Sequence, residues 1–336
     1  MEQHANGRSP APVLLTISAA LAAASIAGAA AAASQDAYPT RPVRLVVAQA
    51  PGSSIDAMSR VVATKMGELL GEQLVIDNRT GAGGTIGGAI VAHAAPDGYT
   101  LLGAASASQC IGPQLYRKHV TYDRDRDFTA ISMFAVTQNI LAVHPKVPFK
   151  SVRELVAYAK ANPGKLNWAN AGSGFQSHLA GVLFTHMAGI EALHVPYKGA
   201  GASLGAVIAG ESQVTIVPAP SVMGHVQAGR LRALAIASEK RSPIAPELPT
   251  IMEAGVPGYL SSGWAGLMAP VKTPKPIQRK LYDTLVKAMK DPATDAAMTK
   301  LGAEPMATTG DEFAAVVQRD CKSLAEAIRV SGIQPN

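Results

Sequence analysis

Short apolar runs alternate with longer amphipathic segments through the first part of the chain. The short runs are rich in β-branched residues, as buried strands are, whereas the longer segments repeat apolar residues at helical spacing. The expected elements are a strand at Val43–Ala48, a helix from Asp56 to Leu70, a strand at Leu74–Asp77, a helix from Thr85 to Ala94 and a strand at Tyr99–Ala104. This alternation predicts a parallel sheet with helices on both faces.

A second set of alternating strands and helices begins near Leu141. Its expected strands are Leu166–Ala169, His194–Pro196, Gln213–Val217 and Leu231–Ala237. Its expected helices are a segment ending at Ala161, then Ser177–Ala188, Ala202–Ala209 and Ser221–Ala228. Ser151 and Glu154 have the spacing of a capping box at the start of the first of these helices. The second set therefore predicts another open sheet.

The last part of the chain is mainly helical in pattern. After an apolar run at Trp264–Ala269, helices are expected at Ile277–Lys290, Pro292–Leu301 and Asp311–Ser331. Asp291 before Pro292, and Thr309 with Glu312, are typical helix starts. A helical tail with no sheet of its own must pack on an earlier domain. We therefore expect two lobes, residues 38–141 plus 259–336 and residues 142–258, with the chain crossing near Leu141 and near Gly258.

The N-terminus has the pattern of an export signal. Arg8 precedes an apolar run from Val13 to Ala33 that ends in small residues. The alternative is a retained anchor helix, because the run is about as long as the ~20 residues that span a membrane. Its second half is nearly all Ala and only weakly hydrophobic, which favours cleavage. We therefore expect a signal peptide of residues 1–33 and a mature protein in the periplasm.

Composition and charge exclude several classes of protein. The chain has 336 residues, 48% of them hydrophobic and 16% charged, with a formal net charge of +6. Charged residues fall below the usual ~25%, which argues against a disordered chain or a coiled coil. The basic excess is spread along the chain, so no nucleic-acid partner is expected. The two cysteines, Cys110 and Cys321, exclude a four-cysteine zinc site, and they form either one bridge or two buried thiols.

Three turns that contain Gly lie between a predicted strand and a predicted helix, at residues 51–54, 81–85 and 172–177. The second turn invites comparison with a dinucleotide-binding loop, but the third glycine of that motif would fall at Ile86, and no Walker sequence is present. Each turn offers backbone N–H donors and hydroxyls at a helix N-terminus, where anions bind. In open α/β sheets, ligands bind at the carboxyl ends of the strands. Three such turns over two lobes therefore predict a carboxylate-binding cleft.

The sequence gives little support to catalysis. Ser177 and His178 are adjacent, but neighbours on a helix point about 100° apart and do not form a nucleophile and base pair. A Gly-x-Ser-x-Gly elbow is missing, and the histidines lack the spacing of a metal site. We therefore expect no enzymatic activity, no catalytic residue, no metal and no cofactor.

A series of motifs resembles one known family, the Bug-type solute receptors of tripartite tricarboxylate transporters. The motifs are Tyr38–Arg44, Pro51-Gly52 with Asp56, Asn78–Gly87, Pro96–Leu102, Leu115-Tyr116, Tyr122-Asp123, Asp127-Phe128, Gly172–Gly181 and Val195–Gly199. This resemblance implies a two-lobe, type II-like periplasmic binding fold of the α/β class that closes on a small carboxylic acid. Lys198 belongs to the last motif, although an exposed lysine at a strand end is commonly structural.

The turns and the resemblance together give the expected ligand-binding residues. They are Pro51, Gly52, Ser53, Ser54, Asp56, Gly84, Thr85, Ser106, Gly172, Ser173, Gly174, Ser177, His178, Tyr197, Pro218 and Ala219. The family's usual double glycine is Gly52-Ser53 here, and its Asp-containing segment reads Val214 to Pro220 without Asp. The second difference makes one wall apolar and removes a partner for a ligand ammonium. It predicts a carboxylate ligand without an amino group and with an aromatic or aliphatic body.

The sequence thus predicts a periplasmic solute-binding protein, expected to be monomeric, that captures a small organic carboxylate for a tripartite tricarboxylate-type transporter. The expected partners are the ligand and either membrane permease subunits or a sensor kinase. The alternatives are a ligand sensor without transport and a secreted hydrolase.

Overall fold

The structure is a computed structural model that describes residue 1 and residues 38–172, 175–243 and 245–333. The predicted signal peptide lies outside the described residues, apart from Met1. By its internal contacts the chain divides into two units, Met1–Thr40 and Arg41–Asn336. Every helix and strand of the described residues belongs to the second unit. Of these helices, none combines the length and the hydrophobicity needed to cross a membrane.

The first sheet is mixed, with six strands in the described residues. They are β1 (Val43–Val47), β2 (Leu74–Asn78), β3 (Thr100–Ala105), β4 (Phe128–Thr137), β10 (Gly263–Pro270) and β11 (Ala303–Pro305), in the order β11-β4-β10-β3-β1-β2. The three N-terminal strands are parallel as predicted, but β10 runs antiparallel to both β3 and β4, and β11 antiparallel to β4. The prediction covered these three parallel strands and a helical tail packed on an earlier domain; the tail also adds the antiparallel strands β10 and β11 to this sheet. The apolar run of β10 is buried along its whole length, and such a run specifies a central strand without specifying its direction.

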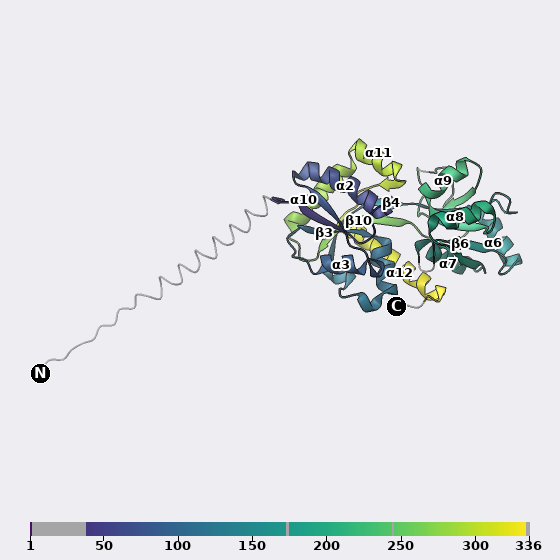
Figure 1. Ribbon diagram of the computed structural model, residues 1–336, viewed down its shortest axis with the longest axis horizontal. Helices are drawn as coiled ribbons and strands as arrows, with labels where there is room; N and C mark the ends of the chain where they lie inside the picture. The colour runs from purple at the N-terminus through teal and green to yellow at the C-terminus, as the bar shows by residue number, and fades with distance from the viewer. Residues whose placement is uncertain (2–37, 173–174, 244, 334–336) are drawn as a thin grey trace. The chain divides into compact units, whose positions relative to one another are not determined.

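Helices cover the first sheet, mostly where the sequence predicts them. The main ones are α2 (Ser54–Leu70), α3 (Thr85–Ala92), α10 (Lys275–Met289), α11 (Pro292–Lys300) and α12 (Gly310–Ser331). Both α10 and α11 pack on α2, and α3 packs on β3 and β10 (Figure 1). Short helical turns follow β2 and β3: η1 (Ala82–Gly84), η2 (Ala107–Ile111), α4 (Gly112–Leu115), η3 (Arg117–His119) and α5 (Arg124–Asp127).

The second sheet has five strands in the described residues and is also mixed. They are β5 (Asn139–Val143), β6 (Asn167–Asn170), β7 (Leu193–Pro196), β8 (Val214–Pro218) and β9 (Arg232–Ile236), in the order β7-β6-β8-β5-β9. β6 is parallel to β7 and β8, whereas β5 is antiparallel to its neighbours. Four helices accompany this sheet and are grouped around β6 in Figure 1: α6 (Val152–Ala161), α7 (Gln176–Ala188), α8 (Ala200–Ala209) and α9 (Ala219–Gln227).

The predicted helix starts are largely confirmed. The Asp291 carboxylate caps α11 by accepting from the Thr294 N–H, and Thr309 and Glu312 form a complete capping box on α12. Ser151 caps α6 through the Glu154 N–H, but the Glu154 carboxylate accepts from the N–H of Lys150 and not from that of Ser151. The reciprocal half of that predicted box is therefore wrong.

The C-terminal helix α12 joins the two parts of the molecule. It packs on β4 and η2 beside the first sheet and on α7 beside the second. A disulfide joins Cys110 in η2 to Cys321 in α12, with a Cα–Cα distance of 4.6 Å. The question left open by the sequence is thus answered in favour of the bridge, which fastens α12 to the turn after β3.

Candidate functional site

A cavity of about 600 Å³ lies where the ends of strands from both sheets meet. The first sheet contributes residues that follow β1, β2 and β3, together with Thr137 and Trp264 from β4 and β10. The second sheet contributes the start of α7 at Phe175 and Gln176 and the end of β8 at Pro218. The cavity is therefore built by both sheets, as the two-lobe prediction requires.

The turn between β1 and α2 brings serines and backbone donors to the cavity. Ser53, Ser54 and Ile55 line it. The Ser53 hydroxyl caps the helix by accepting from the Asp56 N–H at 3.4 Å. The N–H groups of Ser54 and Ile55 belong to the first helical turn, where no earlier carbonyl of the helix can accept them. Ser54 and Ile55 thus place the positive end of a 17-residue helix at the cavity.

Asp56 supports this turn from behind and does not line the cavity. Its carboxylate accepts from the Gly52 N–H at 2.8 Å and from the side chains of Arg60 and Asn78. Burial alone would raise the pKa of Asp56, but the hydrogen bonds from Arg60, Gly52 and Asn78 together hold it below its usual value. The carboxylate therefore stays ionised and fixes the Gly52 backbone, whose φ of 80° favours glycine.

The Gly-rich turn after β2 acts mainly by allowing close packing. Gly81 and Gly83 line the cavity, whereas Gly84 and the buried Thr85 do not. The Thr85 hydroxyl donates to the Ala82 carbonyl. A Cβ on Gly84 would lie 2.6 Å from the Cβ of Ser108. This turn thus lies directly against η2. The close contact that forms this wall of the cavity is possible because glycine has no side chain.

The turn between β6 and α7 is the matching feature of the second sheet. The Gly172 N–H donates to the Asn170 side chain, and the Ala171 N–H donates to the Ser177 hydroxyl at 2.9 Å. Ser177 therefore braces the turn, while Gln176 at the first helical position lines the cavity. Ser173 and Gly174, two further predicted ligand residues, lie outside the described residues.

The wall after β8 offers few donors. Pro218 and Pro220 line the cavity, and the N–H of Ala219 is taken by the Gln138 carbonyl. Proline has no N–H, so this helix start presents apolar surface to the cavity.

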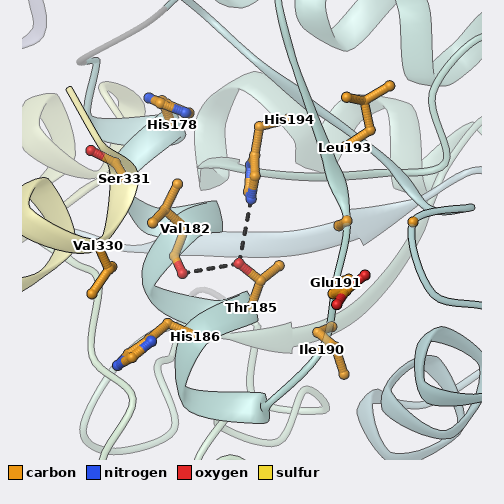
Figure 2. Close-up of a pocket in the computed structure, with 12 residues that line it drawn as sticks. His178, Val182, Thr185, His186, Ile190, Glu191, Leu193, His194, Val330 and Ser331 are labelled. Carbon is orange, nitrogen blue, oxygen red and sulfur yellow. Dashed lines mark hydrogen bonds between the residues drawn. The ribbon is translucent and has the colours of Figure 1, made fainter.

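The predicted His178 lines a different cavity of about 620 Å³, beside α7 and the end of α12. Figure 2 shows His178 and His194 on this cavity, with the Thr185 hydroxyl between His194 and the Val182 carbonyl. The hydroxyl proton goes to Val182, so Thr185 accepts from the N–H at Nε2 of His194. Burial, with the neighbouring His178, lowers the pKa of His194 to about 4. This cavity therefore holds neutral histidine and does not resemble an anion site.

The structure brings together only part of the predicted ligand set. Ser53, Ser54, Ser106 and Pro218 line the 600 Å³ cavity. The other described members do not line this cavity, although several lie in the same turns as lining residues. They are Pro51, Gly52, Asp56, Gly84, Thr85, Gly172, Ser177, His178, Tyr197 and Ala219. Tyr197 instead bonds the Ser212 hydroxyl through its own hydroxyl at 3.1 Å.

Sequence reasoning missed several lining residues, namely Gln49, Thr80, Tyr116, Thr137, Phe175, Gln176 and Trp264. Gln49 and Thr80 are neighbours in sequence of predicted turns and Gln176 lies within one, so these residues could have been included on that ground. Thr137 and Trp264 gave no local signal, because they reach the site through the antiparallel pair β4 and β10.

Comparisons with known proteins point to one family. The family model described as "Tripartite tricarboxylate transporter family receptor" matches residues 58–333. The protein BugT of Bordetella pertussis is 36% identical over 307 residues, which cover 91% of this chain and 94% of BugT.

Two solved structures share the fold. A structure titled as a periplasmic transporter is 36% identical, covers 89% of this chain and 100% of its own, and has a TM-score of 0.71. An R. palustris protein solved with adipate is 33% identical, covers 89% of this chain and 100% of its own, and has a TM-score of 0.72. The resemblance drawn from the motifs and the expected two-lobe fold are thus confirmed, and the chain belongs to the tripartite tricarboxylate transporter family of receptors.

Proposed function

We propose that this chain is a non-enzymatic periplasmic receptor that captures a small organic carboxylate in the 600 Å³ cavity and delivers it to membrane subunits of a transporter. The observation that carries the proposal is the pair of helix starts, α2 and α7, whose first turns line one cavity from the two sheets. Helix N-termini stabilise an anion without a fixed cation. The R. palustris relative was solved with adipate, which is a small organic carboxylate.

Capture also needs movement of the lobes. We propose that residues 38–141 with 259–336 and residues 142–258 form two bodies that close around the ligand. Closure would bring the α2 and α7 donors to the same molecule and present a distinct surface to the membrane subunits. Small-angle scattering should then give a smaller radius of gyration with a bound carboxylate than without it.

The direct test places a negative charge where the ligand carboxylate is expected. The variants Ser54→Asp and Gln176→Glu each add a negative charge to a helix start in the cavity. This charge competes with the ligand carboxylate, but it stabilises the helix because it lies near the helix N-terminus. We expect each variant to lower the affinity for bound carboxylates at least tenfold in calorimetry without lowering the melting temperature.

The matched control is Ala293→Glu, which adds the same charge to the exposed first turn of α11, outside the cavity. Its affinity should stay within twofold of the parent. A panel of adipate, malate, benzoate and amino acids supplies the ligands, and one present at 100 times its Kd stabilises by about 2.7 kcal/mol. If no carboxylate stabilises the protein, or if Ser54→Asp and Gln176→Glu bind carboxylates as the parent does, the proposal is wrong.

A further inference from the structure

None of the described residues that line the 600 Å³ cavity carries a charged side chain. The lining contains no Asp, Glu, Lys, Arg or His, and its polar side chains are Ser, Thr, Gln and one Tyr. A ligand ammonium, or several charges spread over a ligand, would lose water here without gaining a counter-charge. The backbone donors of α2 and α7 serve one charged end well. We therefore expect the rest of the ligand to be neutral.

Three aromatic side chains face this neutral space, although aromatics make only 5% of the chain. Trp264 is 4% exposed, and its ring packs edge-on against Phe313. Its only polar atom, Nε1, donates to Asp320, which does not line the cavity. The indole is therefore nearly buried, and the small part of it that borders the cavity is carbon.

The other two rings rest on glycine backbone. A Cβ on Gly83 would come within 2.9 Å of the Tyr116 ring, and a Cβ on Gly172 would come within 3.1 Å of the Phe175 ring. Both rings are thus held against the chain on one side. Phe175 is nevertheless 61% exposed at the start of α7, a cost in hydrophobic exposure that an apolar ligand would relieve. Trp264 and Tyr116 come from the first sheet's side and Phe175 from the second.

We propose that the ligand is a carboxylic acid with an aromatic ring, its carboxylate at the first turns of α2 and α7 and its ring among Trp264, Tyr116 and Phe175. This inference rests on the proposed function and narrows it. Aromatic pairs gain from edge-to-face and offset contacts beyond simple burial, so an aromatic ring uses these walls better than a short aliphatic chain. The volume of about 600 Å³ also exceeds what a four-carbon acid would fill.

Two matched comparisons by calorimetry test the ligand class. 3-Phenylpropionate and phenylalanine share a ring and a carboxylate and differ by the ammonium group; we expect phenylalanine to bind at least tenfold more weakly. Benzoate and 3-phenylpropionate should both bind at least tenfold more tightly than malate and adipate. If malate or adipate binds more tightly than both aromatic acids, the aromatic proposal is wrong while the carboxylate receptor stands. If no carboxylate binds, both proposals are wrong.

Variants assign the ring contact. Phe175→Ala removes an exposed ring and should leave the fold intact, and Trp264→Phe keeps an aromatic residue of smaller area. We expect Phe175→Ala to lower the affinity for 3-phenylpropionate about fivefold to tenfold. The loss of affinity for adipate in the same variant should be several-fold smaller. The control is Val75→Ala, an exposed apolar residue on β2 outside the cavity. Equal losses for both acids in Phe175→Ala and Trp264→Phe would overturn the assigned ring position.

Discussion

The Nε1 of Trp264 donates to a carboxylate oxygen of Asp320 at 2.8 Å. Trp264 lines the ligand cavity, and both residues line a neighbouring cavity of about 420 Å³. Gln138 and Leu260 line that second cavity, near the places where the chain passes between the sheets. One indole thus lies between the 600 Å³ cavity and the 420 Å³ cavity, and the carboxylate of Asp320 holds its Nε1.

Asp320 should make the protein less stable as the pH rises. Burial raises the pKa of Asp320 to about 6, against the opposing effects of the Trp264 N–H and the Arg319 charge. Because this pKa is above the value of 3.8 expected without burial, the folded state holds the proton more tightly than the unfolded state. Protonated Asp320 contributes fully to the stability of the folded state below about pH 4. This contribution, about 2 to 3 kcal/mol, is lost as the pH rises through about 6.

Asp320→Asn removes this titration and keeps an acceptor for Trp264. We expect the free energy of unfolding in urea to rise at pH 7.5 and to change little at pH 4.5. Asp295→Asn, at an exposed position on α11, is the control and should change neither value by more than about 0.5 kcal/mol. A lower stability of Asp320→Asn at pH 7.5 would show that the ionised form of Asp320 is the favoured one.

His194 should act in the opposite direction over the same pH range. Its pKa is lowered from 6.5 to about 4, first by burial and then by His178, whose ring centroid lies 5.5 Å away. The unfolded state therefore holds the proton more tightly, so this contribution is complete above about pH 6.5 and is lost as the pH falls through 4. Between pH 4 and 6 the effects of His194 and Asp320 partly cancel.

His194→Gln separates the two effects. Glutamine keeps a polar group near the Thr185 hydroxyl but does not ionise. We expect this variant to lose less stability than the parent between pH 7.5 and 4.5, whereas Asp320→Asn loses more. The exposed His93→Gln is the matched control and should follow the parent curve. Parallel curves for His194→Gln and the parent would contradict the assignment.

How much of the site could be predicted depends on how far apart its residues lie in sequence. The Asp291 cap and the Thr309 capping box were predicted because each signal lies within four residues of its partner. Trp264 begins an apolar run in the sequence, but nothing in such a run distinguishes a residue that faces a ligand from one that faces the core. Its place at the cavity depends on β10 pairing with β3, which lies nearly half of the chain earlier in the sequence.

Predicted ligand residues failed to line the cavity for a related reason. Composition indicates that a turn can bind an anion, but not which of its polar atoms are used within the turn itself. Three of the predicted residues, Asp56, Thr85 and Ser177, have polar side chains. In each of them the side-chain oxygen is hydrogen-bonded to neighbouring backbone or side-chain groups. The turns were therefore predictable, whereas the division between supporting and lining residues needed coordinates.

The Cys110–Cys321 disulfide should contribute strongly to stability. It closes a loop with a sequence separation of 211 residues, and the chain-entropy model gives about 5 kcal/mol for a loop of this size. Removing both cysteines as alanines should lower the urea midpoint and, because η2 lines the cavity through Ala107 and Ile111, weaken ligand binding several-fold. Oxidised and reduced parent protein provide the matched pair. Equal midpoints for the two would contradict the bridge.

Ser177→Ala distinguishes a bracing hydroxyl from a nucleophile. In the structure the Ser177 Oγ accepts from the Ala171 N–H, and His178, the adjacent imidazole, lines the separate cavity beside α12. Removing the hydroxyl leaves this N–H without its acceptor, which costs about 1 to 3 kcal/mol, and loosens the turn that presents Gln176. We expect a lower melting temperature and several-fold weaker carboxylate binding. Ser177→Thr should recover part of both, and Ser221→Ala, at an exposed position on α9, should match the parent. Ester turnover by the parent that disappears in Ser177→Ala would instead identify a hydrolase.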